Sequence, residues 1–198
     1  MESGHTPDKQ VPGCWADGDI PWVSLNDTAQ LRVVDHIAET AFYTNAAGIE
    51  NSSAKLLPAG AVLFSRDATI GLCAITAKPM AVSQHFIAWI CGPDLVPEYL
   101  LFVLRSMTQE LSSLTMGSTV KTIGMPDVRT LCVPVPPIAE QAQIVNAVKE
   151  KRERLNIGIT KLAEQAHRLR EYRAALISAA VTGQLDIRKH EKQLEALA

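Results

Sequence analysis

Apolar residues follow two different patterns along this chain, and the pattern changes near Pro137. Before that point, short apolar runs are separated by turn-forming residues, which is typical of strands and short helices in a mixed fold. After it, apolar residues recur at spacings of three and four, the period of an amphipathic helix. The pattern predicts an α+β fold, with a mixed, β-rich first domain followed by a long C-terminal coiled-coil helix.

The apolar runs of the first domain predict five strands and a helix. The helix is expected to begin at Pro97, because proline suits the first turn of a helix. Residues 117–122 are polar and predict a loop. The expected strands are 20–24, 61–65, 72–76, 85–90 and a closing strand at 131–135.

The C-terminal region carries a heptad repeat from Val145 to Ala180. We expect the helix to begin after Pro137 and to end near Gly183, since glycine commonly follows the last helical residue. Its length is then roughly 65 Å. The predicted domains are 1–137, the helix 138–183 and a tail 184–198. The apolar residues expected in a helix–helix interface are Val145, Val148, Leu155, Ile159, Leu162, Ala166, Leu169 and Leu176.

An isolated helix with such a stripe gains little stability by itself, so the stripe needs a partner. The helix either folds onto its own domain or pairs with a second chain. The first domain has no second heptad run, which favours a second copy. Arg152 and Arg173 both occupy the a position of the heptad. In a parallel pair each of them would face the same arginine of the second copy, so we favour an antiparallel pair.

Composition and charge exclude several classes of protein. Hydrophobic residues make up 47% of the 198 residues and aromatic residues 5%, which excludes a disordered chain and an aromatic platform for RNA bases. The formal net charge is −2, but residues 1–137 hold 8 Lys/Arg against 13 Asp/Glu, whereas residues 138–198 hold 11 against 8. The four cysteines lie far apart, so neither a zinc site nor a disulfide framework is expected. Without a signal segment or membrane span, we expect a cytoplasmic protein.

Sequence signatures of catalysis are missing. There is no phosphate-binding glycine loop, no metal-binding motif and no nucleophile elbow. In addition, no lysine lies two residues after an Asp or Glu, so the carboxylate-x-lysine part of a nuclease site is missing. These absences favour a binding protein over an enzyme, with a stand-alone enzyme of unrecognised mechanism and a coiled-coil adaptor that binds only protein as the alternatives.

Six segments in their order resemble the specificity subunits of type I restriction-modification systems. They are Ser-Gly-His-Thr-Pro at 3–7, Trp15 to Ser24, Leu57 to Gly71, Gly117 to Ile123, Val133 to Gln141 and Glu171 to Gly183. The resemblance implies a target recognition domain that binds double-stranded DNA at a bipartite sequence. It also implies modification (methyltransferase) subunits and restriction subunits as partners. S-adenosylmethionine and ATP would be used only by those partners, so no cofactor and no metal are expected here.

The family carries two recognition domains and two helices in one chain, and this sequence has one of each. We therefore expect a half-size subunit or a fragment of a longer one. A half-size subunit would form a homodimer and read a palindromic target in two halves.

The resemblance and the polar loops together indicate a DNA-binding surface. Phosphate contacts need local positive charge, for which Arg66, Lys121 and Arg129 are candidates. Alternatively, Arg66 and Asp67 form an ordinary turn ion pair, and residues 117–118 an ordinary loop after a helix. The charges along the long helix either form a solvated face or contact DNA or a partner. The DNA-binding candidates are Ser65, Arg66, Thr69, Gln84, His85, Ser118, Thr119, Lys121 and Thr122.

Overall fold

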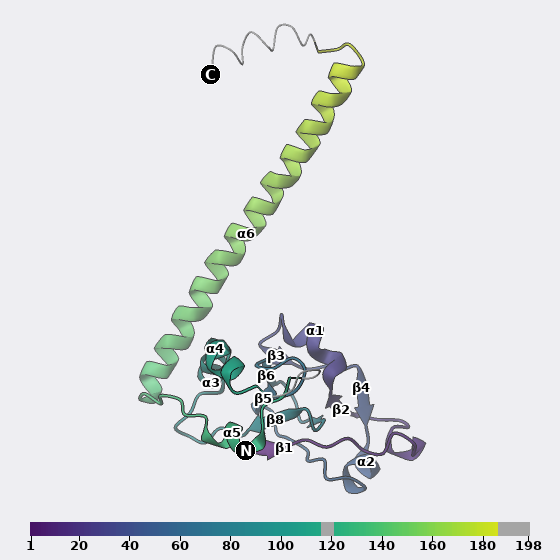
Figure 1. Ribbon diagram of the computed structural model, residues 1–198, viewed down its shortest axis with the longest axis vertical. Helices are drawn as coiled ribbons and strands as arrows, with labels where there is room; N and C mark the ends of the chain where they lie inside the picture. Colours follow the sequence, from purple (N-terminus) through teal and green to yellow (C-terminus); the bar gives the residue numbers. More distant parts are fainter. Residues whose placement is uncertain (116–120, 186–198) are drawn as a thin grey trace. The chain divides into compact units, whose positions relative to one another are not determined.

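The computed structural model describes residues 1–115 and 121–185. It divides the chain into two compact units, Met1–Asn146 and a second unit that begins at Ala147. Figure 1 shows the sheets and short helices of the first unit and the long helix α6 (Ile138–Val181), which crosses the boundary between the units. The expected mixed fold with a long C-terminal helix is confirmed. None of the helices in the described ranges is long and apolar enough to span a membrane.

Within the described residues, the first unit contains a five-stranded and a three-stranded sheet. The larger sheet has the order β1-β8-β5-β6-β3, and its neighbours are antiparallel except β3 and β6. In the smaller sheet, β2 pairs antiparallel with β4 and parallel with β7. The strands are β1 Glu2–Ser3, β2 Ile20–Val23, β3 His36–Ile37, β4 Phe42–Thr44, β5 Val62–Ser65, β6 Cys73–Thr76, β7 Ala81–Val82 and β8 Phe86–Trp89.

Short helices connect the strands of the first unit. Two of them are 3-10 turns, η1 Pro12–Cys14 and η2 Leu25–Asp27. The α-helices are α1 Thr28–Leu31, α2 Ala46–Glu50, α3 Pro97–Ser106, α4 Thr108–Ser113 and α5 Met125–Thr130.

The central strands of the larger sheet are buried on both faces. Leu63 of β5 belongs to one apolar cluster, whereas its neighbours Val62 and Phe64 belong to a second cluster with the leucines of α3. Successive strand residues point to opposite faces, so the sheet has a core on each side. This explains why these strands are continuous apolar runs. It also leaves the turns between them to supply the polar surface.

Four of the five predicted strands are confirmed. The segments 20–24, 61–65, 72–76 and 85–90 contain β2, β5, β6 and β8, and the helix expected from Pro97 is α3. Strands β1, β3, β4 and β7 are only two or three residues long, too short to show an apolar period, and the pattern does not predict them.

The predicted closing strand at 131–135 is wrong, because the chain there is irregular. Pro134 and Pro136 have no N–H group to donate to a strand ladder. The carbonyl of Pro134 instead accepts a hydrogen bond from the hydroxyl of Tyr99 at 3.0 Å. At the other end of α6 the expected glycine stop is confirmed, since Gly183 has a φ of 71°.

Gln141 attaches the start of α6 to the loop before α3. Its side chain is fully buried. The amide nitrogen donates to the carbonyls of Asp94 and Pro136, each at 2.8 Å, and the amide oxygen accepts from the N–H of Val96 at 2.8 Å. One side chain therefore satisfies three backbone groups, and the first turn of α6 is part of the first unit.

We expect Gln141→Leu to lower the free energy of unfolding of the first unit by about 2 kcal/mol or more, because the three backbone groups lose their partner without regaining water. Urea unfolding followed by circular dichroism measures the change. Gln143→Leu is the matched control, since Gln143 is exposed on the same helix. Equal midpoints for the two variants would contradict this role of Gln141.

Candidate nucleic-acid interface

The turn between β5 and β6 has an unusual backbone. Ala68 has a φ of 58° and Gly71 a φ of 84°, both in the left-handed region. Glycine adopts this region freely, but alanine there costs of order 1 kcal/mol. Contacts with a distant segment offset that cost, because the Ala68 N–H donates to the carbonyl of Lys121 at 2.9 Å.

The carboxylate of Asp67 lies at the centre of this turn and joins three segments. Its Oδ2 is 2.9 Å from Nδ1 of His85, in the loop before β8, and 3.8 Å from Nη2 of Arg66. Its Oδ1 accepts a hydrogen bond from the hydroxyl of Thr122. The carboxylate side chain is only 12% exposed, so water does little to replace these partners.

Arg66 joins the same segments through its guanidinium. Its Nε donates to the carbonyl of Gln84 and its Nη1 to the carbonyl of Ile123, each at 3.3 Å. The backbone N–H of Arg66 also donates to the carbonyl of His85 at 3.0 Å, and the carbonyl of Arg66 accepts from the N–H of Ile123 at 2.9 Å. The guanidinium is therefore directed toward the chain itself, and the alternative of an Arg66–Asp67 turn ion pair describes only one part of its contacts.

Seven of the nine predicted DNA-binding residues come together here. Gln84 and Lys121 are exposed, and Thr69, His85 and Thr122 are half-buried. Ser65 is fully buried, and its hydroxyl donates to the Asp67 carbonyl at 3.1 Å. Ser118 and Thr119 lie outside the described residues. Arg129 is exposed on α5.

Two residues of this surface were not among the predicted DNA-binding set. Asp67 is one, and Arg32, the residue after α1, is the other. Arg32 lines a pocket of about 400 Å³ together with Thr69 and Lys121. Asp67 is marked in the sequence only by its place beside Arg66 in a turn. Arg32 carries no local signal, because its neighbours in the pocket come from distant parts of the chain.

The arrangement suits an anionic, hydrogen-bonding ligand. Lys121 and Arg32 bring two exposed cations to one pocket, and such cations attract phosphate groups. Gln84 and His85 lie together, with Gln84 Nε2 3.5 Å from His85 Nε2, and both side chains carry donors and acceptors that can pair with base edges. Among the residues described, no cluster of three or more His, Cys, Asp or Glu side chains could hold a metal ion.

Residues 1–165 match the family model of the type I restriction modification DNA specificity domain. The chain belongs to this family of specificity subunits. The match includes every segment that meets at Asp67, so the surface described above lies inside the family domain.

Curated relatives agree with this assignment. The chain is 27% identical over 150 residues to the type I restriction enzyme MjaIX specificity subunit of Methanocaldococcus jannaschii, covering 75% of this chain and 34% of the relative. It is 27% identical over 167 residues to the EcoR124I/EcoR124II specificity subunit of Escherichia coli, covering 80% and 39%. This chain therefore spans less than two fifths of the length of either relative.

Two solved structures show the same fold. One comes from work on complex assembly and conformational transition of the type I R-M system, with a TM-score of 0.68 at 20% identity over 90% of this chain and 42% of that one. The other is the HsdS subunit from Thermoanaerobacter tengcongensis, with a TM-score of 0.56 at 19% identity over 78% of this chain and 35% of that one.

Asp67→Asn is expected to lower the free energy of unfolding by about 1.5–3 kcal/mol, because it removes the charge that pairs with His85 and Arg66 in a poorly hydrated site. Arg66→Lys should also destabilise, since lysine cannot reach both carbonyls and the carboxylate together. Urea unfolding measures both. Asp94→Asn, at an exposed position, is the control, and a loss of stability no larger than the control's would show that Asp67 is not a central contact.

Proposed function

We propose that this chain recognises a DNA sequence as a specificity subunit of a type I restriction-modification system and has no catalytic activity of its own. The family match over residues 1–165 carries the proposal, since it covers the entire polar surface around Asp67. The chain spans only part of its relatives, so its target and its partners are proposals as well.

Lys121 and Arg32 are the proposed phosphate contacts. Both are exposed and line the same pocket beside the β5–β6 turn. Residues 1–137 have more acidic than basic residues, so binding depends on where the cations lie rather than on the total charge. Contacts of this kind set affinity and register but carry no sequence information.

Gln84, His85, Thr69 and Thr122 are the proposed base-reading side chains of the described surface. A glutamine amide can pair with the major-groove edge of adenine through a donor and an acceptor. Ser65 and Arg66 have a different proposed role, because one is buried and the other donates within the chain. They would hold the base-reading side chains in position without contacting DNA.

Ser118 and Thr119 also stay proposed readers. They precede Lys121 in the sequence by three and two residues, and the carbonyl of Lys121 accepts a hydrogen bond from the Ala68 N–H of the β5–β6 turn.

The proposed protein partners are the modification (methyltransferase) subunits and the restriction subunits. Adenine methylation with S-adenosylmethionine and DNA cleavage with ATP would be reactions of those subunits. The contribution of this chain would be to choose the site at which they act.

A second copy of this chain is the proposed partner of α6. Leu155, Ile159, Leu162 and Leu169 are between 63% and 68% exposed, and burying each leucine would contribute about 1.5–3 kcal/mol. Val145 is only 5% exposed in the single chain, so it is not available to a partner. Val148, Ala166 and Leu176 are half-buried and remain proposed interface residues. An antiparallel pair would separate Arg152 from the Arg152 of the second copy, and Arg173 from the Arg173 of the second copy.

Lys121→Ala and Arg32→Ala are expected to weaken DNA binding by similar factors for all sequences and to reduce the salt dependence of log K by about one each. Gln84→Ala should instead relax the preference at one base position, by about 1–3 kcal/mol of discrimination. Filter binding with the modification subunits present measures both effects, on targets found by methylation-sensitive sequencing of host DNA. Lys55→Ala is the control.

Unchanged affinity for both cation variants would refute the assignment of the surface. A chain that joins the modification subunits without conferring any DNA binding would instead be a protein-only adaptor.

Leu162→Glu is expected to turn the dimer into a monomer, because it places a charge in the centre of the apolar stripe. Analytical ultracentrifugation at micromolar concentrations measures the change. Thr160→Glu adds the same charge two residues earlier, outside the stripe, and should leave the dimer intact. A wild-type chain that sediments as a monomer at high micromolar concentration would contradict the pairing.

A further inference from the structure

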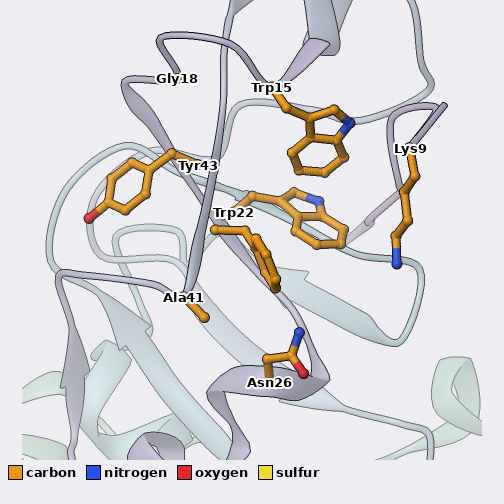
Figure 2. Close-up of a pocket in the computed structure, with 8 residues that line it drawn as sticks. Lys9, Trp15, Gly18, Trp22, Asn26, Ala41 and Tyr43 are labelled. Atoms are coloured by element: carbon orange, nitrogen blue, oxygen red, sulfur yellow. The ribbon is translucent and has the colours of Figure 1, made fainter. Parts of the chain in front are cut away.

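A second pocket, of about 570 Å³, lies in the first unit and shares no lining residue with the pocket beside Asp67. Its volume is in the usual range for small-ligand sites. Figure 2 shows that aromatic rings form much of its wall. The lining residues are Lys9, Trp15, Gly18, Trp22, Asn26, Ala41, Phe42 and Tyr43.

Three of the four aromatic residues that line this pocket lie close together. Trp15 and Trp22 pack edge to face, with ring centroids 5.1 Å apart and an interplanar angle of 80°. Phe42 of β4 is the direct antiparallel partner of Trp22 in β2, so both side chains project from the same face of the sheet. Trp22 is 4% exposed, whereas Phe42 is 47% exposed. The ring of Phe42 is therefore accessible to a ligand, whereas the indole of Trp22 is buried.

Both indole N–H groups are already used within the chain. Nε1 of Trp15 donates to the Asp8 carbonyl at 3.0 Å, and Nε1 of Trp22 donates to the His5 carbonyl at 3.2 Å. These bonds hold the rings in place before any ligand arrives. Trp15, which is half-buried, therefore offers a ligand only ring surface, and this suits a flat aromatic ligand better than a peptide whose carbonyls need donors.

The polar groups of the pocket are few and of defined kinds. Lys9 is the charged residue among those that line it, and Asn26 supplies an amide with both donor and acceptor atoms. Both side chains are exposed. In Figure 2 the Asn26 amide and the Lys9 ammonium group lie nearer to the Trp22 ring than to the Tyr43 ring in this view.

A buried carboxylate holds the walls of the pocket in position. Asp27 is 3% exposed, and its two oxygens accept from the N–H of Ser24 at 2.8 Å and from the N–H of Ala41 at 2.7 Å. It therefore links η2, which carries Asn26, to the segment that enters β4 and carries Phe42. Contacts within the chain thus fix two walls of the pocket relative to each other.

We infer that this pocket binds a single nucleotide. Its base would stack on the ring of Phe42 and against Trp15, with its edge on the Asn26 amide and its phosphate near the Lys9 ammonium. Stacking on aromatic side chains accepts any base, and an amide can pair with the edge of a base. The nucleotide is either free in solution or an unpaired unit of a DNA strand, and both sources present the same chemistry.

The test is quenching of tryptophan fluorescence in the full-length chain. A Trp89→Phe background removes the tryptophan that packs on Phe64, outside the pocket, and leaves Trp15 and Trp22 as reporters. The probes are the four deoxynucleoside monophosphates, a duplex with one unpaired nucleotide, the same duplex fully paired, and a proline-rich peptide. Phe42→Ala and Asn26→Ala are expected to weaken binding about tenfold or more, and Lys9→Gln a few-fold.

Leu56→Ala and Lys161→Gln are the matched controls, since they remove an exposed apolar side chain and an exposed lysine that do not line the pocket. Saturable quenching by monophosphates that the pocket variants weaken supports a site for free nucleotides. Quenching only by the duplex with the unpaired nucleotide, weakened by the same variants, supports a site for a DNA unit.

Quenching by the peptide alone, by no probe, or equally in the pocket variants would overturn the inference. Lys121→Ala separates it from the proposed function, because that variant should weaken binding to paired DNA and leave the response to monophosphates unchanged. Loss of only one of the two activities identifies which assignment has failed.

Discussion

The carboxylate of Asp67 is the contact that gives the proposed DNA surface its shape. It brings together the β5–β6 turn, the loop before β8 and the segment before α5 by pairing with Arg66, His85 and Thr122. A poorly hydrated carboxylate is tolerated only with such partners, because burying an unpaired charge is expensive. The same contacts that satisfy Asp67 therefore hold together the segments that carry the exposed side chains of Gln84 and Lys121.

The packing of the sheet explains why function falls to these turns. Strands β5, β6 and β8 have apolar clusters on both faces, so their side chains are used in the core. Polar groups are accommodated where the strands end. Asp27 serves the second pocket as Asp67 serves the turn, since each buried carboxylate joins its own segment to others and fixes the exposed side chains that those segments carry. The first unit thus has two candidate binding surfaces, each organised by one buried acidic residue.

Much of the fold could be predicted from local patterns. Apolar runs identified the four longest strands, and the three-four spacing with Pro137 and Gly183 at its ends identified α6. The error at 131–135 arose because apolar residues there alternate with prolines, which cannot donate to a ladder. The candidate DNA residues are polar groups in or next to predicted loops. Their meeting was foreseeable only from the family resemblance, and the burial of Ser65 was not foreseeable at all.

The sequence by itself determined the mixed fold, the long helix and the family, because each depends on the spacing and order of residues along the chain. The tertiary structure alone decided which side chains face each other. Asp67 is 18 residues from His85 and 55 from Thr122, and Trp22 faces Phe42 only through the pairing of β2 with β4. Such contacts depend on strand register and turn geometry, which place distant residues together without leaving a local pattern in the sequence.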